Sequence, residues 1–244
     1  MLRLGVDVGG TDTDAVLLDT VQGIVAAVKR PTTPDVTRGI HLAIEGVLAH
    51  LHSVTDDVQA VSIAPKHFVN ALVERDPIRL DRVAIIRLCG PFTHGTPPFV
   101  AFPLHLRSFL EGPSFLLSGG LQIDGSEISP VDLSQVESAC TEIAKRNIRA
   151  VVVSSVFAPI DFTIKQEEHA ASLVCNALKD VDVVCSKDVA HIGLLERENA
   201  AILNASLLRY MKKTVSGFQH AARNMRLNCP RVHYQQRRDA SEWL

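Results

Sequence analysis

The sequence predicts an α/β protein with a mixed β-sheet, and three observations support this. The first thirty residues read as three short apolar strands joined by tight turns, which favours antiparallel pairing at the start of the chain. After them, strand-like and helix-like segments alternate, as they do in α/β proteins. The run 148–158 is apolar and β-branched between polar neighbours, which is typical of a buried central strand.

The first half of the chain follows this order. Leu2, Leu4, Val6 and Val8 alternate with other residues, which is the period of a strand. Strands are expected at 2–9, 13–19, 23–31, 58–64 and 81–90. Apolar residues at helical spacing predict helices at 33–53 and 66–75, and a proline-rich loop follows at 91–103.

In the second half, turn and capping residues set the expected boundaries. Gly119 and Gly120 predict a hairpin within 114–125, and Ser129 with Pro130 predicts the start of a helix. Helices are expected at 129–147, 163–180 and 194–224, and strands at 148–158 and 181–190. The last residues are polar and without periodicity, so 225–244 is expected to be a divergent, poorly ordered tail.

Composition limits the classes of function. A length of 244 residues, 46% hydrophobic residues and 21% charged residues fit a globular protein with a sizeable core. The net charge of −2 gives no indication of nucleic-acid or anionic-membrane binding. No apolar run reaches the roughly 18 residues of a membrane-spanning helix, and the start does not resemble a signal peptide.

The cysteines indicate a reducing compartment. Five occur, an odd number, and they are widely spaced with no CxxC motif. They are expected to be reduced thiols, mostly in the core, so a cytoplasmic protein is predicted.

The stretch "GVDVGGTDTD", residues 5–14, is the main candidate site. Its glycines allow a tight turn and the close approach of a ligand, and its threonines and aspartates can bind phosphate, Mg²⁺ or water. The candidates for an anion-binding hairpin are Asp7, Gly9, Gly10, Thr11, Thr13 and Asp14. The alternative interpretation is an ordinary glycine-rich β-turn.

Other polar residues have a plain structural interpretation beside a functional one. The histidines at 67, 94, 105 and 191 show no metal-ligand spacing and are expected to be ordinary surface or hydrogen-bonded residues. The run 196–198, "ERE", is expected to be a solvated or salt-bridged helix face. Arg87 and Cys89 lie at the end of a strand, where α/β sites form, but Cys89 is expected to be structural.

Several stretches together resemble the N-terminal region of the hydantoinase A/oxoprolinase family, in its hydantoin-utilisation branch. This family belongs to the actin-like ATPase superfamily. The stretches are "LGVDVGGTDTDAVLLD", "AAVKRPTTPDVTRGI", "SIAPKHFVNALVERD", "RVAIIRLCGP" and "IGLLERENAAILNASL". They extend from residue 2 to about residue 208.

The resemblance implies a ribonuclease H-like fold, in which a mixed sheet is flanked by helices, and a nucleotide phosphate at the first hairpin. It implies a hydrolase of cyclic amides, of the hydantoin or 5-oxoproline class, that uses ATP and Mg²⁺. Asp7 would be the catalytic and metal-binding residue. Gly9, Gly10, Thr11, Thr13, Asp14, Lys66 and Asn70 would bind the cofactor.

The sequence departs from the family pattern at Ala64, Pro65 and Lys66, where the family has Gly-Thr-Thr before the "NAL-ER" helix. Lys66 can bind phosphate as a point charge, and the alternative interpretation is a decayed site. Asn70 still matches the pattern. The match also raises Glu196, Arg197 and Asn199 as candidates, since it places them where two domains meet.

The resemblance covers only the first half of a two-domain architecture. It divides the chain into an N-terminal domain at 1–195, the opening helix of a second domain at 196–224 and the tail at 225–244. A truncated chain is expected to be weakly active or inactive alone. The partners implied are a small-molecule substrate and either a second subunit or another copy of the chain. The alternatives are a non-catalytic, partner-binding remnant and a small-molecule kinase of the same superfamily.

Overall fold

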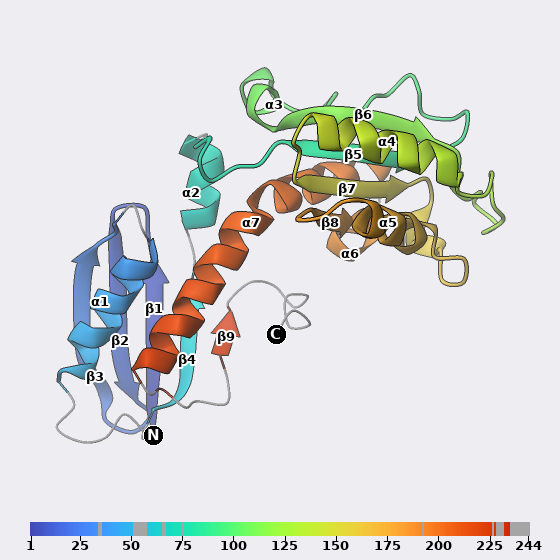
Figure 1. Ribbon diagram of the computed structural model, residues 1–244. Coiled ribbons are helices and arrows are strands. Elements are labelled where there is room, and N and C mark those ends of the chain that lie inside the picture. The colour runs from blue at the N-terminus through green and yellow to red at the C-terminus, as the bar shows by residue number, and fades with distance from the viewer. Residues whose placement is uncertain are drawn as a thin grey trace. The chain divides into compact units, whose positions relative to one another are not determined.

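The computed structural model describes residues 1–33, 36–50, 58–64, 67–74, 76–191, 193–225, 227 and 232–234. It divides the chain into two compact units (Figure 1). Unit 1 comprises Met1–Glu74 and Met211–Leu244, and unit 2 comprises Arg75–Tyr210. The long helix α7 (Leu194–Asn224) contributes its first half to unit 2 and its second half to unit 1.

Unit 1 contains a five-stranded mixed sheet with the order β3-β2-β1-β4-β9. Its strands are β1 (Leu2–Val8), β2 (Asp12–Asp19), β3 (Gly23–Pro31), β4 (Val58–Ala64) and β9 (Val232–Tyr234). The first three strands pair antiparallel, whereas β4 runs parallel to β1 and β9 parallel to β4. The mixed sheet predicted from the opening meander is therefore confirmed.

Helix α1 (Val36–Leu48) covers one face of this sheet (Figure 1). Val6 and Val8 of β1 point into the core on that face, because successive strand residues alternate between the two faces. Ile40 and Ile44 of α1 are fully buried, and their helical spacing places them on one stripe of the helix. Residues of the opposite parity, including Asp7, lie on the other face of the sheet.

The second half of α7 belongs to the core of unit 1. Phe218 is completely buried there. Gly217 packs closely on α1, since a Cβ at this position would lie 2.3 Å from Oγ1 of Thr37. A glycine is needed at this crossing because a side chain would displace one of the two helices.

Unit 2 is built on a four-stranded sheet with the order β6-β5-β7-β8, in which every pair is parallel. Its strands are β5 (Val83–Leu88), β6 (Glu111–Leu117), β7 (Ala150–Ser155) and β8 (Asp182–Cys185). All residues of β5 and β7 are buried. This agrees with central strands of a parallel sheet whose two faces are both covered.

Helices cover both faces of the unit 2 sheet. On one face, α4 (Leu133–Lys145) and α5 (Gln166–Ala177) pack on the apolar side chains of β5 and β7. On the other face, Glu198 of α7 binds Arg87 of β5, a residue of the opposite parity. The shorter helices of the two units are α2 (His67–Glu74), α3 (Leu104–Leu110), α6 (Ser186–Val189) and the 3₁₀ turn η2 (Ala158–Ile160). Among the described helices, none has the length and apolarity needed to cross a membrane.

The domain boundary expected between 195 and 196 stays a prediction, since the two compact units describe contacts within this chain and not the limits of the family's domains. The structure differs from the sequence-based expectation in two places. The expected hairpin at Gly119 and Gly120 is wrong, because residues 111–117 instead form β6 parallel to β5. Within the segment 225–244, residues 232–234 form strand β9 on the edge of the unit 1 sheet.

Candidate functional site

The turn between β1 and β2 forms the tip of the candidate hairpin. Strand pairing places Val8 opposite Thr13, and the backbone N–H of Gly9 donates to the carbonyl oxygen of Asp12 at 2.9 Å. A Cβ on Gly9 would lie 2.8 Å from that oxygen, so this tight turn requires a glycine. The structure therefore confirms a β1–β2 hairpin with a glycine-dependent tip.

Two carboxylates face each other across this hairpin. Asp7 of β1 is the register partner of Asp14 of β2, so both side chains lie on the sheet face opposite α1. Asp14 is in turn paired with Lys29 of β3, whose Nζ lies 3.9 Å from Oδ1 of Asp14 and 3.6 Å from Oδ2 of Asp12. Like charges opposite each other are unfavourable without a compensating cation. Lys29 supplies such a cation on the Asp14 side of this row.

The two threonines of the motif have different environments. Thr13 is fully buried, and its Oγ1 lies 3.0 Å from Oγ1 of Thr32. The Thr32 hydroxyl donates to the carbonyl oxygen of Gly9 at 3.0 Å. The backbone N–H of Thr32 donates to the carbonyl oxygen of Thr11 at 2.8 Å. Thr13 thus helps to hold the shape of the turn from inside. Thr11 is exposed at the tip, where its hydroxyl donates to Asp12 at 3.3 Å.

Helix α2 lies beside the tip of the hairpin. A Cβ at Gly10 would lie 3.0 Å from Nδ2 of Asn70 and 3.7 Å from Oε1 of Glu74. The structure thus places Asn70 beside the hairpin, and the cofactor-binding role that the resemblance implies for it stays a prediction. Ala64 ends β4 as the register partner of Asp7. Lys66, the predicted phosphate ligand, lies outside the described residues.

A second polar cluster lies inside unit 2, at the carboxyl ends of its strands. Arg87 donates from Nε and Nη2 to the two carboxylate oxygens of Glu198, at 2.8 and 2.5 Å, and neither side chain is exposed. Ser154 of β7 donates to the same carboxylate at 2.6 Å. Arg87 also donates to the carbonyl oxygen of Thr96 at 2.7 Å. The cluster fastens α7 to β5 and β7.

Arg197, the neighbour of Glu198, extends this cluster toward β8. Its Nη2 donates to the carbonyl oxygen of Ser155 at 2.6 Å, and its Nε donates to the hydroxyl of Ser186 at 2.8 Å. Ser186 in turn donates to Glu167 of α5 at 2.6 Å. Burial raises the pKa of Glu167 from 4.5 to about 7, although its bonds from Ser186 and from the N–H of Lys187 oppose this shift.

The "ERE" run was expected to be a solvated or salt-bridged face, and the salt-bridged alternative holds for Glu198, which pairs with Arg87 inside the protein. Glu196 is exposed, but Arg197 and Glu198 are buried in the network, and Asn199 is half-buried. Cys89 is buried, and burial raises the pKa of its thiol, so it stays protonated and is a poor nucleophile. Among the described residues, no group of three or more His, Cys, Asp or Glu side chains forms a metal site.

The raised pKa of Glu167 predicts a pH-dependent stability. The native state keeps a proton that the unfolded chain releases, so the free energy of unfolding falls as pH rises from about 4.5 to about 7. The expected loss is up to roughly 3 kcal/mol, from a shift of about 2.5 pH units. Urea unfolding across this range should show a flatter profile for Glu167→Gln than for the wild type. The exposed Glu137→Gln is the control, and parallel profiles for wild type and Glu167→Gln would contradict the prediction.

The comparison with protein families identifies the chain. The family described as "Hydantoinase/oxoprolinase N-terminal region" matches residues 3–177, which is most of the chain. The chain therefore belongs to the hydantoinase/oxoprolinase family, as the sequence motifs predicted.

Two curated relatives match over nearly the whole chain. The chain is 29% identical to caprolactamase subunit alpha of Pseudomonas jessenii over 87% of its own length and 32% of the relative. It is 25% identical to the uncharacterised protein MJ0964 of Methanocaldococcus jannaschii over 88% of its length and 32% of the relative. The chain thus spans about a third of the length of both relatives.

Solved structures confirm the fold. An acetone carboxylase, solved without nucleotide in a study of ATP-dependent acetone carboxylation, has a TM-score of 0.71 at 19% identity, over 91% of this chain and 34% of that one. The ATP-dependent caprolactamase of Pseudomonas jessenii has a TM-score of 0.68 at 24% identity, over 95% of this chain and 35% of that one. The ribonuclease H-like class, a mixed sheet flanked by helices, is therefore the fold of this chain's family.

Proposed function

We propose that this chain is the phosphate-binding N-terminal part of an ATP-dependent hydrolase of cyclic amides. One observation carries the proposal: Asp7 and Asp14 are cross-strand partners directly beside the glycine turn of the first hairpin. Membership of the hydantoinase/oxoprolinase family and the likeness to a caprolactamase subunit support the reaction class. The substrate class is a cyclic amide such as a lactam, hydantoin or 5-oxoproline.

The residues of the hairpin fit a metal–phosphate group. Mg²⁺ in proteins commonly takes one or two carboxylates and completes its shell with phosphate and water, and the Asp7–Asp14 pair supplies such carboxylates. Gly10 and Thr11 form an exposed tip, so their backbone N–H groups can donate directly to a phosphate. The carboxamide of Asn70 lies beside this tip and can donate to a phosphate oxygen.

Bound ATP would supply a phosphoryl group for the oxygen of the amide carbonyl. The phosphorylated amide would have a carbonyl carbon that water can attack. Asp7 and Asp14 would hold the metal, and the glycine turn would let the phosphates come close to the backbone. Thr13 and Thr32 would keep the turn in shape from the buried side of the hairpin.

We propose that the activity of the whole enzyme involves parts beyond the chain described here. The chain corresponds to about a third of its relatives, and one of these is called a subunit alpha. We therefore assign to this chain the nucleotide phosphates, and to a further part or a second subunit the remainder of the cleft. We therefore expect weak or no turnover by this chain alone.

The proposal predicts that MgATP stabilises the folded chain and that Gly10→Val removes this effect. A ligand at one hundred times its dissociation constant adds about 2.7 kcal/mol to the free energy of unfolding. The valine side chain would fill the space between the tip and Asn70. Thermal unfolding with and without MgATP measures the effect.

Gly95→Val is the matched control for this experiment, because a Cβ at Gly95 meets nothing within 4 Å. It should keep the full MgATP-dependent rise in melting temperature. The proposal fails if saturating MgATP leaves the wild type unchanged, or if Gly10→Val responds as the wild type does.

A further inference from the structure

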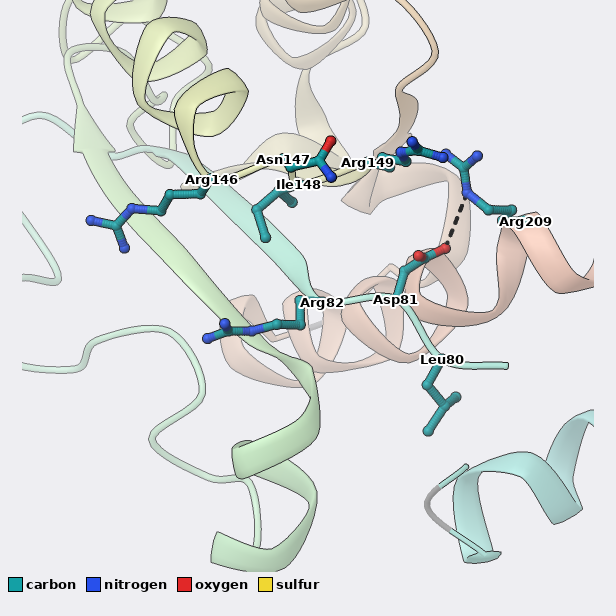
Figure 2. A pocket seen from close by; sticks show the side chains of 8 residues that line it. All are labelled: Leu80, Asp81, Arg82, Arg146, Asn147, Ile148, Arg149 and Arg209. Atoms are coloured by element: carbon teal, nitrogen blue, oxygen red, sulfur yellow. Dashed lines mark ion pairs between the residues drawn. The ribbon is translucent and has the colours of Figure 1, made fainter. Parts of the chain in front are cut away.

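Unit 2 has a hollow of about 370 Å³ that the hairpin site does not involve (Figure 2). Four of the eight residues that line it are arginines. The eight are Leu80, Asp81, Arg82, Arg146, Asn147, Ile148, Arg149 and Arg209. It lies at the amino ends of the parallel strands, opposite the edge at which Arg87 and Glu198 meet. We call it the arginine hollow.

The topology explains why the arginines converge. Val83 of β5 and Ala150 of β7 are register partners, so the residues just before them, Arg82 and Arg149, arrive side by side at one sheet edge. Helix α7 closes a third side, because the carbonyl oxygen of Ser206 accepts a hydrogen bond from the N–H of Asp81 at 2.9 Å. Three segments that are distant in sequence thus contribute arginines to the lining of one hollow.

Arg82 is held in position by hydrogen bonds to a neutral acceptor. Its Nε and Nη2 both donate to the backbone carbonyl oxygen of Glu111, at 2.9 and 2.5 Å. The carboxylate of Glu111 is engaged by Arg107 at 2.7 Å through both oxygens. The Arg82 guanidinium is therefore fixed by a neutral group, and its direct partners include no carboxylate within the described structure.

The other three arginines each have a carboxylate partner, and Nε of Arg146 donates to Glu142 at 2.7 Å. Arg149 and Arg209 share the exposed Asp180, each with an N–O distance of 3.6 Å, and Arg209 also lies 3.4 Å from Asp81. The two pairs with Asp180 are long and open to solvent, and ion pairs of this kind contribute little and are readily exchanged. Within the described part of the chain, Nη1 of Arg82, both Nη atoms of Arg146, and Nε and Nη2 of Arg149 make no hydrogen bond.

Helix electrostatics do not explain the whole cluster. Arg146 is the C-cap of α4, where a cation offsets the negative end of the helix dipole. Arg82 and Arg149 instead precede strands, so this explanation does not apply to them. Figure 2 shows Arg82 and Arg146 extending toward one side of the hollow, while the guanidinium groups of Arg149 and Arg209 lie next to each other on another.

We propose that the arginine hollow binds a small molecule that carries a diphosphate group. Guanidinium groups match phosphate oxygens through paired N–H donors, and the free donors lie on two sides of the hollow. A volume of about 370 Å³ suits a small ligand, and the four arginines against a single aspartate in the lining favour an anion. The site is separate from the hairpin of unit 1 and does not depend on the proposed function.

The test is calorimetric titration of the whole chain with inorganic pyrophosphate, without divalent metal and at low ionic strength. The wild type should bind, and Arg82→Gln/Arg149→Gln should bind at least tenfold more weakly. Both side chains are on the surface, so this variant should keep the wild-type melting temperature. Arg82→Lys/Arg149→Lys should give an intermediate affinity, since it keeps the charge but loses the planar donors.

Controls separate this site from other sources of binding. The exposed pair Arg38→Gln/Arg223→Gln removes the same two charges elsewhere and should bind as the wild type does. Gly10→Val should also keep pyrophosphate binding, whereas loss in that variant alone would assign the binding to the hairpin and overturn the proposal. Unchanged affinity in Arg82→Gln/Arg149→Gln would overturn it as well. Equal affinity for citrate would overturn the assignment to phosphate.

Discussion

Replacing Glu198 with alanine is expected to destabilise unit 2 by about 3–5 kcal/mol, because the change leaves the Arg87 guanidinium buried without its carboxylate. Arg87 and Glu198 are both inaccessible to solvent and are joined by two hydrogen bonds. Ser154 would lose its acceptor in the same change. Urea unfolding of wild type and variant, followed by circular dichroism, measures the difference.

Two further variants make this prediction specific. Arg87→Met/Glu198→Leu removes both charges and should be clearly more stable than Glu198→Ala, because no buried charge is left alone. Glu142→Ala breaks an ion pair with Arg146 that is exposed to solvent, and it should change stability by at most about 1 kcal/mol. Equal losses for Glu198→Ala and Glu142→Ala would show that the buried pair is not formed.

The second large effect is expected for Phe218→Ala, which should destabilise unit 1 by about 3–5 kcal/mol. Phe218 lies on the second half of α7 and is fully buried. Its loss would leave a cavity in the core of unit 1. Urea unfolding measures this change too. The result bears on the domain division, because the sequence assigned 196–224 to a domain otherwise missing.

Phe162→Ala is the matched control for Phe218→Ala. Phe162 is 79% exposed, so the same truncation should change the free energy of unfolding by no more than about 0.5 kcal/mol. A stability of Phe218→Ala close to that of Phe162→Ala would contradict the packing of α7 in unit 1.

Local patterns were sufficient to predict much of the fold. The alternation in 2–8 and the glycines at its end predicted the β1–β2 hairpin, and the apolar run at 148–158 predicted the central strand β7. Both depend on interactions between near neighbours in sequence or on burial of one contiguous segment. The family resemblance supplied the ribonuclease H-like class, which periodicity alone does not specify.

Long-range contacts account for what was missed. Gly119 and Gly120 indicated a hairpin, but both have positive φ in a turn that packs against Leu88 of the neighbouring strand β5. Strand β9 has only three residues, too few for a period to be read. Its parallel pairing with β4 joins segments far apart in sequence. Local propensity carries no information about such a pairing.

The candidate site shows the same division. The residues of the hairpin indicated its carboxylates and the family resemblance indicated Asn70, and the structure places them around one tip. The sequence could not show that the Thr13 side chain points into the core, where it lies beside that of Thr32. Arg87 was a usable signal, because an arginine within an apolar strand needs a buried partner. That the partner is Glu198 depends on how α7 packs, so the sequence could not identify it.

Calorimetric titration with MgATP tests the central claim, that the first hairpin binds nucleotide phosphate, most directly. Wild type should bind MgATP, and Asp7→Asn, which keeps the shape but not the charge, should bind at least tenfold more weakly, a difference of about 1.4 kcal/mol. The exposed Asp124→Asn should bind as the wild type does. An affinity unchanged in Asp7→Asn, or no binding by the wild type, would contradict the claim.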